Sequence, residues 1–157
     1  MSILRGVKFF QGILIIVVSL VSLITFPSLV QGDEWVKIGS SELLSQYYKP
    51  SSIEIDNTKK IIKVWVKDVY TDKGKNYFLR NFDDVKKQQY ITFESTLTFF
   101  LFNYKEWKYG IIHLIFYSKS GDILFDKKLL PKWNDIKSDT LQDELFNKIL
   151  QDYNIQR

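Results

Sequence analysis

His113 is the only histidine in the 157-residue chain, so any imidazole chemistry must be built on it. A single histidine excludes a multi-histidine metal site. A general base also needs a reacting group within hydrogen-bond reach, and the flanking Ile111 and Ile115 offer no nucleophile. The sequence therefore predicts a structural or surface histidine, and an enzyme that uses His113 is the third of three hypotheses for function.

Two pairs of acidic residues are the other candidates for chemistry: Asp83 with Asp84, and Asp122 with Asp126. Paired carboxylates can bind calcium, but neither pair has the spacing of a calcium-binding loop. The chain also contains no glycine-rich phosphate loop, nucleophile elbow or metal-binding helix motif. We therefore expect solvated turn charges at these positions, no metal, no cofactor and no enzymatic activity.

The triplet Lys63, Trp65 and Lys67 is the candidate binding site. Residues two apart lie on one face of a β-strand, so all three would share a surface. The tryptophan supplies contact area and the lysines attract an acidic protein, a glycan or an anionic surface. The alternative is that the helix or a neighbouring strand covers Trp65 while the lysine stems pass beside it.

The element that positions this triplet is the most regular strand of the sequence, predicted over residues 60–70. Its other face carries Ile62, Val64 and Val66. This apolar face is predicted to be buried, and the face that carries the triplet is predicted to be solvent-exposed. A helical turn is predicted within residues 41–48, and a loop over residues 71–76. Short strands are predicted at residues 34–38 and 52–55, and a loop with a short helix within residues 77–89.

Residues 92–126 are predicted to form two consecutive β-hairpins. The first strand alternates and then becomes apolar on both faces, which is typical of a central strand. Gly121 can adopt the positive φ that the turn at residues 118–122 requires. Strict alternation in the second strand divides its side chains between two faces: Gly110, Ile112, Leu114 and Phe116 on one, and Ile111, His113 and Ile115 on the other.

A C-terminal helix follows, with Ser138 or Asp139 as its predicted cap. Its apolar residues recur at helical spacing and form a stripe wide enough to pack on a sheet: Leu141, Leu145, Phe146, Ile149 and Leu150. The predicted fold class is therefore α+β. It comprises an antiparallel sheet of about six strands that ends in a meander, with the C-terminal helix packed on it.

The first 32 residues differ from the rest of the chain. Arg5 and Lys8 precede an uncharged, apolar run over residues 12–30, and Val30 and Gly32 are small residues at the −3 and −1 positions of a cleavage site. We predict a signal peptide over residues 1–32, and an uncleaved membrane anchor is the alternative. Either one exports the single predicted domain, residues 33–157.

Charge and cysteine content narrow the class of protein further. The formal net charge is +4, and removal of Arg5 and Lys8 leaves 20 basic against 18 acidic residues. This small, interspersed surplus is not the clustered basic surface of a nucleic-acid-binding protein, so no nucleic-acid partner is expected. The chain has no cysteine, which excludes a disulfide, a thiolate metal site and a lipidated cysteine.

Six segments occur in the order typical of one family: WVKI (35–38), YYKPSSI (47–53), IKVWVK (62–67), LFNYKEWKY (101–109), YSKSGD (117–122) and WNDI (133–136). Over residues 33 to about 150 the chain resembles the bacterial surface-adhesin protein E family. The resemblance implies an antiparallel sheet with a C-terminal helix packed on it. For particular pathogen members it also implies adhesion to host extracellular proteins.

The chain departs from this family at a disulfide. Members commonly carry one cysteine where this chain has Tyr104 and another near the end of the final helix, and the pair would tie the helix to the sheet. Both are missing here. The resemblance therefore implies that apolar packing alone holds the helix, without a cross-link that is typically worth about 2–4 kcal/mol.

The leading hypothesis is an exported, non-catalytic binding domain, a surface adhesin that contacts extracellular proteins or glycans from one sheet face or an edge strand. It would act in the periplasm, at the outer-membrane surface or after secretion, and a homodimer is compatible with the sequence. The alternative is a membrane-anchored periplasmic structural or interaction module of the cell envelope. Only this alternative includes a membrane contact, made by the retained N-terminal segment, and the N-terminus of the mature chain distinguishes the two.

Overall fold

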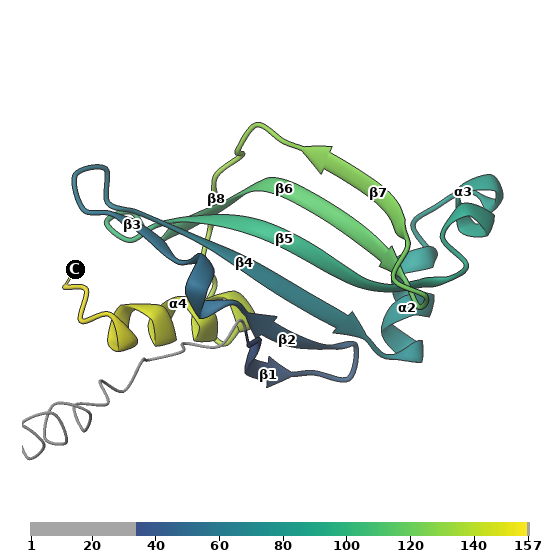
Figure 1. Ribbon diagram of the computed structural model, residues 1–157, viewed down its shortest axis with the longest axis horizontal. Coiled ribbons are helices and arrows are strands. Elements are labelled where there is room, and N and C mark those ends of the chain that lie inside the picture. The colour runs from purple at the N-terminus through teal and green to yellow at the C-terminus, as the bar shows by residue number, and fades with distance from the viewer. Residues whose placement is uncertain (1–33, 157) are drawn as a thin grey trace, which may run out of the picture. The chain divides into compact units, whose positions relative to one another are not determined.

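The computed structural model describes residues 34–156, which form a twisted sheet accompanied by helices (Figure 1). The predicted signal peptide or anchor at residues 1–32 lies outside the described residues. Within residues 34–156, no helix is long and apolar enough to cross a membrane. The elements in chain order are β1 (Val36–Ser40), β2 (Leu44–Tyr48), the 3₁₀ helix η1 (Pro50–Ser52), β3 (Glu54–Asp56), β4 (Ile61–Tyr70), α2 (Asp72–Leu79), α3 (Asp84–Gln89), β5 (Phe93–Asn103), β6 (Lys108–Ser118), β7 (Ile123–Lys128), β8 (Asn134–Asp135) and α4 (Leu141–Asp152).

The sheet is antiparallel throughout, with the strand order β1-β2-β4-β5-β6-β7. The short strands β3 and β8 pair with β4 and β6, respectively. The last three long strands form the two predicted hairpins, and α4 ends the fold. The structure therefore confirms the predicted α+β class, with a C-terminal meander and a C-terminal helix on an antiparallel sheet.

The two faces of the sheet follow from the alternation in β4. Ile62, Val64 and Val66 are fully buried beneath the helices. We call this side of the sheet the helix face. Lys63, Trp65 and Lys67 point to the other side, which we call the open face, and all three are partly exposed.

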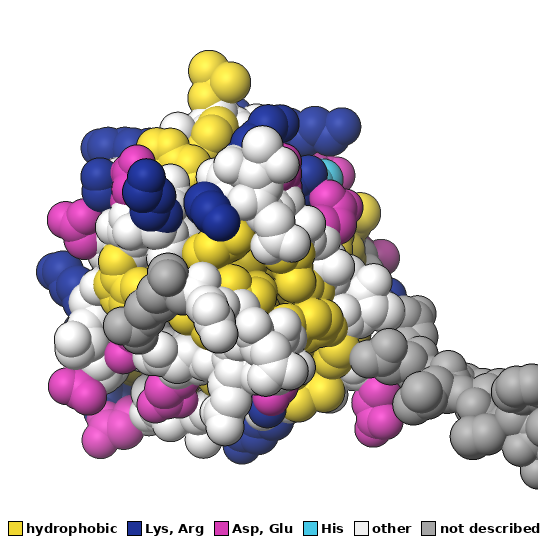
Figure 2. All heavy atoms as spheres, turned by 90° about the vertical axis from the view of Figure 1, so that its left-hand side faces the viewer, with side chains coloured by type: hydrophobic (Ala, Val, Ile, Leu, Met, Phe, Trp, Pro, Cys, Tyr) yellow, Lys and Arg dark blue, Asp and Glu magenta, His cyan; other side chains and the backbone are white. Residues whose placement is uncertain are grey.

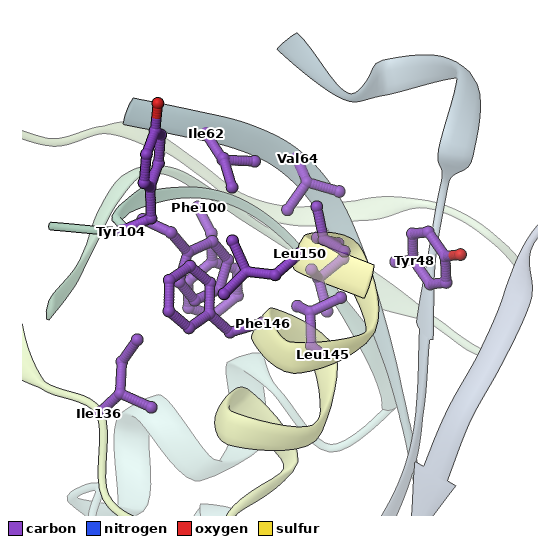
Figure 3. Close-up of a cluster of buried hydrophobic side chains, with 12 residues drawn as sticks. Tyr48, Ile62, Val64, Phe100, Tyr104, Ile136, Leu145, Phe146 and Leu150 are labelled. Carbon is purple, nitrogen blue, oxygen red and sulfur yellow. The ribbon is translucent and has the colours of Figure 1, made fainter. Parts of the chain in front are cut away.

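Helix α4 closes one half of the helix face. Thr140 begins it, because its Oγ1 accepts a hydrogen bond from the Asp143 N–H at 3.2 Å, so the predicted caps Ser138 and Asp139 are wrong. Asp139 instead adopts a positive φ of 60° just before the cap. Figure 3 shows α4 side chains pointing toward the sheet. The resulting α4 cluster includes Tyr48, Ile62, Val64, Val66, Phe100, Phe102, Tyr104, Leu145, Phe146, Ile149 and Leu150.

A polar contact adds to the apolar packing of α4. The Tyr48 hydroxyl donates a hydrogen bond to Asp152 Oδ2 at 3.2 Å, which links β2 to the last turn of the helix. Burial, followed by the charge of Asp152, raises the pKa of Tyr48 to about 12, so the hydroxyl keeps its proton at physiological pH. Tyr104, which stands where the resemblance implies a cysteine, is 3% exposed and belongs to the α4 cluster.

Helix α2 covers the other end of the helix face and α3 follows it in the chain, in a region predicted mostly as loop. Thr71 caps α2 by accepting a hydrogen bond from the Gly74 N–H at 3.1 Å, and Asp83 caps α3 through the Lys86 N–H at 2.9 Å. The predicted loop over residues 71–76 is therefore wrong. Aromatic side chains pack together at this end. We call this group the α2 cluster, and it includes Tyr70, Phe78, Phe82, Tyr90, Phe93 and Phe116.

The predicted helical turn within residues 41–48 is also wrong, because Leu44–Tyr48 is strand β2. A tight turn precedes it, closed by the Ser41 N–H bonded to the Leu44 carbonyl at 2.8 Å. Strand β2 then pairs with β1 on one side and with β4 on the other. These long-range pairings override the weak local helical pattern.

A β-bulge at Ile112 changes the assignment of faces in β6. Phe99 pairs with His113, whereas the next residue, Phe100, pairs with Ile111. Ile112 therefore has no partner in β5. An extra residue reverses the alternation beyond it. Ile111 therefore packs on the α4 cluster, and its predicted grouping with His113 and Ile115 on one face is wrong.

Candidate functional site

His113 lies on the open face, where the sheet register brings it beside an acidic residue of β7. Its Nε2 is 2.6 Å from Asp126 Oδ1, and its ring centroid is 5.3 Å from that of Trp65. The sequence did not predict this pairing, because the two residues are 13 positions apart and meet through the β6–β7 hairpin. The arrangement is a histidine–carboxylate contact packed against an aromatic ring.

The acidic pairs considered for metal binding have other roles. Asp83 and Asp84 belong to the first turn of α3, and their carboxylates pair with Lys86 and Lys87. Asp122 accepts a hydrogen bond from the Ser120 hydroxyl in the β6–β7 turn. In the part of the chain that the structure describes, no group of three or more acidic or histidine side chains could hold a metal ion.

The predicted triplet Lys63, Trp65 and Lys67 shares the open face, but its members have different surroundings. Lys63 Nζ is 2.8 Å from Glu54 Oε2 on the neighbouring strand β3. Trp65 stacks on Phe99, with ring centroids 4.7 Å apart and planes 17° apart. Lys67 makes no ion pair within residues 34–156. The helix covers the opposite face, and Phe99 of the neighbouring strand covers one side of the tryptophan ring.

Two hollows flank the Trp65–Phe99 pair on the open face. The first, which we call the Ser95 hollow, has a volume of about 450 Å³, and the second, the Trp133 hollow, has about 420 Å³. The Ser95 hollow is lined by Lys67, Val69, Glu94, Ser95, Leu97, Tyr117, Ser118, Lys119 and Gly121. The Trp133 hollow is lined by Glu54, Ile55, Asp56, Lys59, Ile61, Lys63, Leu101 and Trp133.

The charges of the Trp133 hollow are internally balanced. Lys63 pairs with Glu54 at 2.8 Å, and Lys59 pairs with Asp56 at 3.6 Å. Figure 2 looks onto the end of the domain that carries the β3–β4 turn, where cationic and acidic side chains surround exposed apolar surface. The two lysines and two acids that line the Trp133 hollow therefore leave it with no excess of either charge.

A band of polar side chains separates the two apolar clusters on the helix face. Asp68 lies on β4 between Val66 of the α4 cluster and Tyr70 of the α2 cluster. Its carboxylate accepts hydrogen bonds from Gln46 Nε2 at 2.9 Å and from the Thr96 hydroxyl at 3.4 Å. Burial raises the pKa of Asp68 against the lowering effect of these bonds, and burial followed by the Asp68 charge raises the pKa of Tyr70 to about 12.

Asp68→Asn is expected to raise the melting temperature at neutral pH. Burial of the Asp68 carboxylate places its folded-state pKa above the unfolded value, so the charged form destabilises the fold at neutral pH. This penalty disappears as the pH falls through the folded-state pKa toward the unfolded value, because the folded state then takes up the proton. The asparagine carbonyl can still accept the bond from Gln46, so the variant carries no such penalty at any pH.

The measurement is thermal unfolding of both proteins from neutral pH down to about pH 4, near the ordinary pKa of an aspartate. The advantage of Asp68→Asn should shrink steadily over this range. The difference between the two proteins is the informative quantity, because the effect of acid on all the other carboxylates is common to both proteins and cancels. A constant difference across the range would contradict the assignment of a raised pKa to Asp68.

Comparison with known proteins gives a protein family and a similar solved structure. The model of the Surface-adhesin protein E family matches residues 35–149, which extend from the start of the sheet almost to the end of α4. The chain is also similar to the crystal structure of Protein E from non-typeable Haemophilus influenzae, with 15% sequence identity and a TM-score of 0.44 over 70% of this chain and 71% of that chain. No curated protein shows a significant match.

Proposed function

Because the chain belongs to the surface-adhesin protein E family, we propose that it is an exported, non-catalytic adhesin that binds an extracellular protein through the open face of its sheet. The family supports an adhesin role and a location outside the cytoplasm. The choice of the open face, and of Lys63, Trp65 and Lys67 within it, rests on the geometry of the domain. The predicted signal peptide over residues 1–32 supplies the route of export.

The observation that carries this proposal is the apolar character of the open face. Its side chains across β4 and β5 include Trp65, Leu97, Phe99 and Leu101, all of them partly exposed. Helices α4 and α2 pack in the two clusters of the helix face, away from these residues. An uncovered apolar surface with a charged rim is typical of a protein-binding site.

Trp65→Ala is expected to weaken binding by about 2 kcal/mol or more, the loss typical of an aromatic hot spot. In affinity this is about 30-fold. Removal of the indole exposes Phe99 and takes away the largest side chain at the centre of the face. The measurement is binding of the purified domain to an immobilised panel of extracellular matrix proteins, with circular dichroism to verify that the variant remains folded.

Tyr77→Ala is the matched control, because Tyr77 is a 59% exposed aromatic residue on α2, away from the open face. This variant should bind the panel as the unmodified domain does. Equal binding by Trp65→Ala would contradict the proposal. An unfolded Trp65→Ala would assign Trp65 to the structural core and direct the search for the binding surface to residues 72–89.

A further inference from the structure

The Ser95 hollow is bordered by two lysines that no described acid neutralises by direct pairing. Lys67 and Lys119 form no ion pair within residues 34–156, and Lys119 has only a longer-range attraction to Asp72. The one carboxylate in the lining, Glu94, is already engaged by Lys75 at 2.8 Å. This hollow therefore differs from the balanced Trp133 hollow by an excess of positive charge.

The shape of the Ser95 hollow follows from the strand register. Ser95 lies in β5 between Val69 of β4 and Tyr117 of β6, so a small side chain is flanked by two larger ones. The β-bulge at Glu94 occurs immediately before it, where the pairing changes from Phe93–Ser118 to Ser95–Tyr117. Ser95 is 7% exposed and forms the floor of the hollow.

The lining sets the chemistry of a ligand. Val69, Leu97 and Tyr117 offer apolar walls for an aliphatic side chain, and Lys67 and Lys119 offer attraction to carboxylates. The volume of about 450 Å³ lies within the range of about 300–1,000 Å³ found for ligand-binding pockets. The ligand that complements both parts of the lining is an apolar side chain with carboxylates on either side of it.

The aromatic rings next to the hollow favour a polypeptide over a glycan. A sugar ring packs on a free aromatic face, but Trp65 and Phe99 stack on each other, with centroids 4.7 Å apart. His113 lies against the tryptophan as well, at 5.3 Å. These contacts leave less free aromatic face for a sugar, whereas the apolar and cationic groups of the hollow suit the side chains of a polypeptide.

We propose that the Ser95 hollow anchors an acidic segment of the partner polypeptide, with an aliphatic side chain over Ser95 and flanking carboxylates at Lys67 and Lys119. The proposal rests on the proposed adhesin function and specifies the partner as an acidic polypeptide. The balanced Trp133 hollow then receives a neutral part of the same partner. Attraction to Lys67 and Lys119 also accelerates the encounter and weakens as salt is added.

The probe for this proposal is an acetylated and amidated peptide, Glu-Asp-Leu-Asp-Glu, titrated into the isotope-labelled domain at low salt. Amide NMR shifts are expected to change around Ser95, Lys67 and Lys119. Lys67→Glu is expected to weaken peptide binding by about tenfold or more, since charge reversal replaces attraction with repulsion. Ser95→Tyr should give a similar loss by filling the hollow without a change of charge.

Lys127→Glu is the matched control. Lys127 pairs with Leu114 on the helix face of β7, so the variant makes the same change of charge away from the hollow. It should lower peptide affinity by less than about threefold at low salt, through the small change in net charge alone. If Ser95→Tyr fails to fold, Lys67→Glu and Lys119→Glu still test the site.

Several outcomes would overturn the proposal. Absence of peptide binding would remove the hollow as an anchor, and the loss of panel binding by Trp65→Ala would then still support the adhesin function. Peptide binding that both Ser95→Tyr and Lys67→Glu leave unchanged would place the contact elsewhere. Binding of a sulfated heparin oligosaccharide in place of the peptide, at the same residues, would replace the polypeptide with a glycan as the partner class.

Discussion

Phe146→Ala is expected to lower the free energy of unfolding by about 3–5 kcal/mol, the usual cost of truncating a buried phenylalanine. Phe146 is completely buried at the centre of the α4 cluster. Its ring stacks on Phe102, with centroids 5.2 Å apart, and meets the edge of Trp107 at 4.6 Å. A small domain is stable by only about 5–15 kcal/mol, so this one truncation removes much of the total.

The measurement is urea denaturation followed by circular dichroism, with the slope of the transition checked for two-state behaviour. Asn147→Ala is the control, because this neighbouring residue is exposed and its side chain bonds only to Asp143. The control should change stability by less than about 0.5 kcal/mol, as surface substitutions usually do. A loss below about 1 kcal/mol for Phe146→Ala would show that α4 does not close the core.

Gly74→Ala is the second substitution with a large expected effect. We expect it to lower the free energy of unfolding, whereas the same change in most helices raises it. In an exposed helix this change stabilises by about 1 kcal/mol, because alanine is the better helix former. In α2, however, a Cβ at this position would lie 1.9 Å from the backbone oxygen of Leu43. The Leu43 carbonyl belongs to the backbone and cannot rotate away as a side chain can, so α2 must shift. We expect the free energy of unfolding to fall by about 2–3 kcal/mol, the scale of overpacking in a core.

The shift would also strain the bonds that hold α2 to the turn before β2. Thr71 donates its N–H to the Leu43 carbonyl at 2.9 Å, and its hydroxyl donates to the Glu42 carbonyl at 2.8 Å. Urea denaturation again measures the change, and Asn76→Ala serves as a control because Asn76 is an exposed residue of the same helix. A Gly74→Ala variant more stable than the unmodified domain would mean that α2 does not approach Leu43 this closely.

The elements that local pattern determines were predictable from the sequence. Strict alternation in residues 61–70 defined β4 and its two faces, and the apolar stripe around Leu145 and Ile149 defined α4. Strand β2 was missed because its conformation depends on pairing with β1 and β4, which lie on either side of it in space. Helix α2 was missed because a short helix in a charged background has little periodicity, whereas α3 lies within residues 77–89, where a loop with a short helix was predicted.

The candidate site was predictable only in part. Period-2 spacing placed Lys63, Trp65 and Lys67 on one face, and the apolar run that includes Phe99 indicated a strand with apolar side chains on both faces. Nothing in the sequence pointed to Ser95, since its hollow arises from a bulge and from neighbours on two other strands. The sequence also shows no sign of the bulge at Ile112. Residues 111–116 are apolar at most positions, so the pattern fits β6 equally well with or without an extra residue.

The polar band around Asp68 has a consequence for how the domain opens. Because Gln46, Asp68 and Thr96 interrupt the apolar contact between the α4 cluster and the α2 cluster, we expect the domain to open locally as two cooperative units of unequal size. When the smaller unit opens, Lys75 of α2 separates from Glu94, and an unpaired carboxylate is left at the Ser95 hollow. An acidic ligand therefore favours the closed form, and its binding suppresses local unfolding of α2 and α3 by mass action.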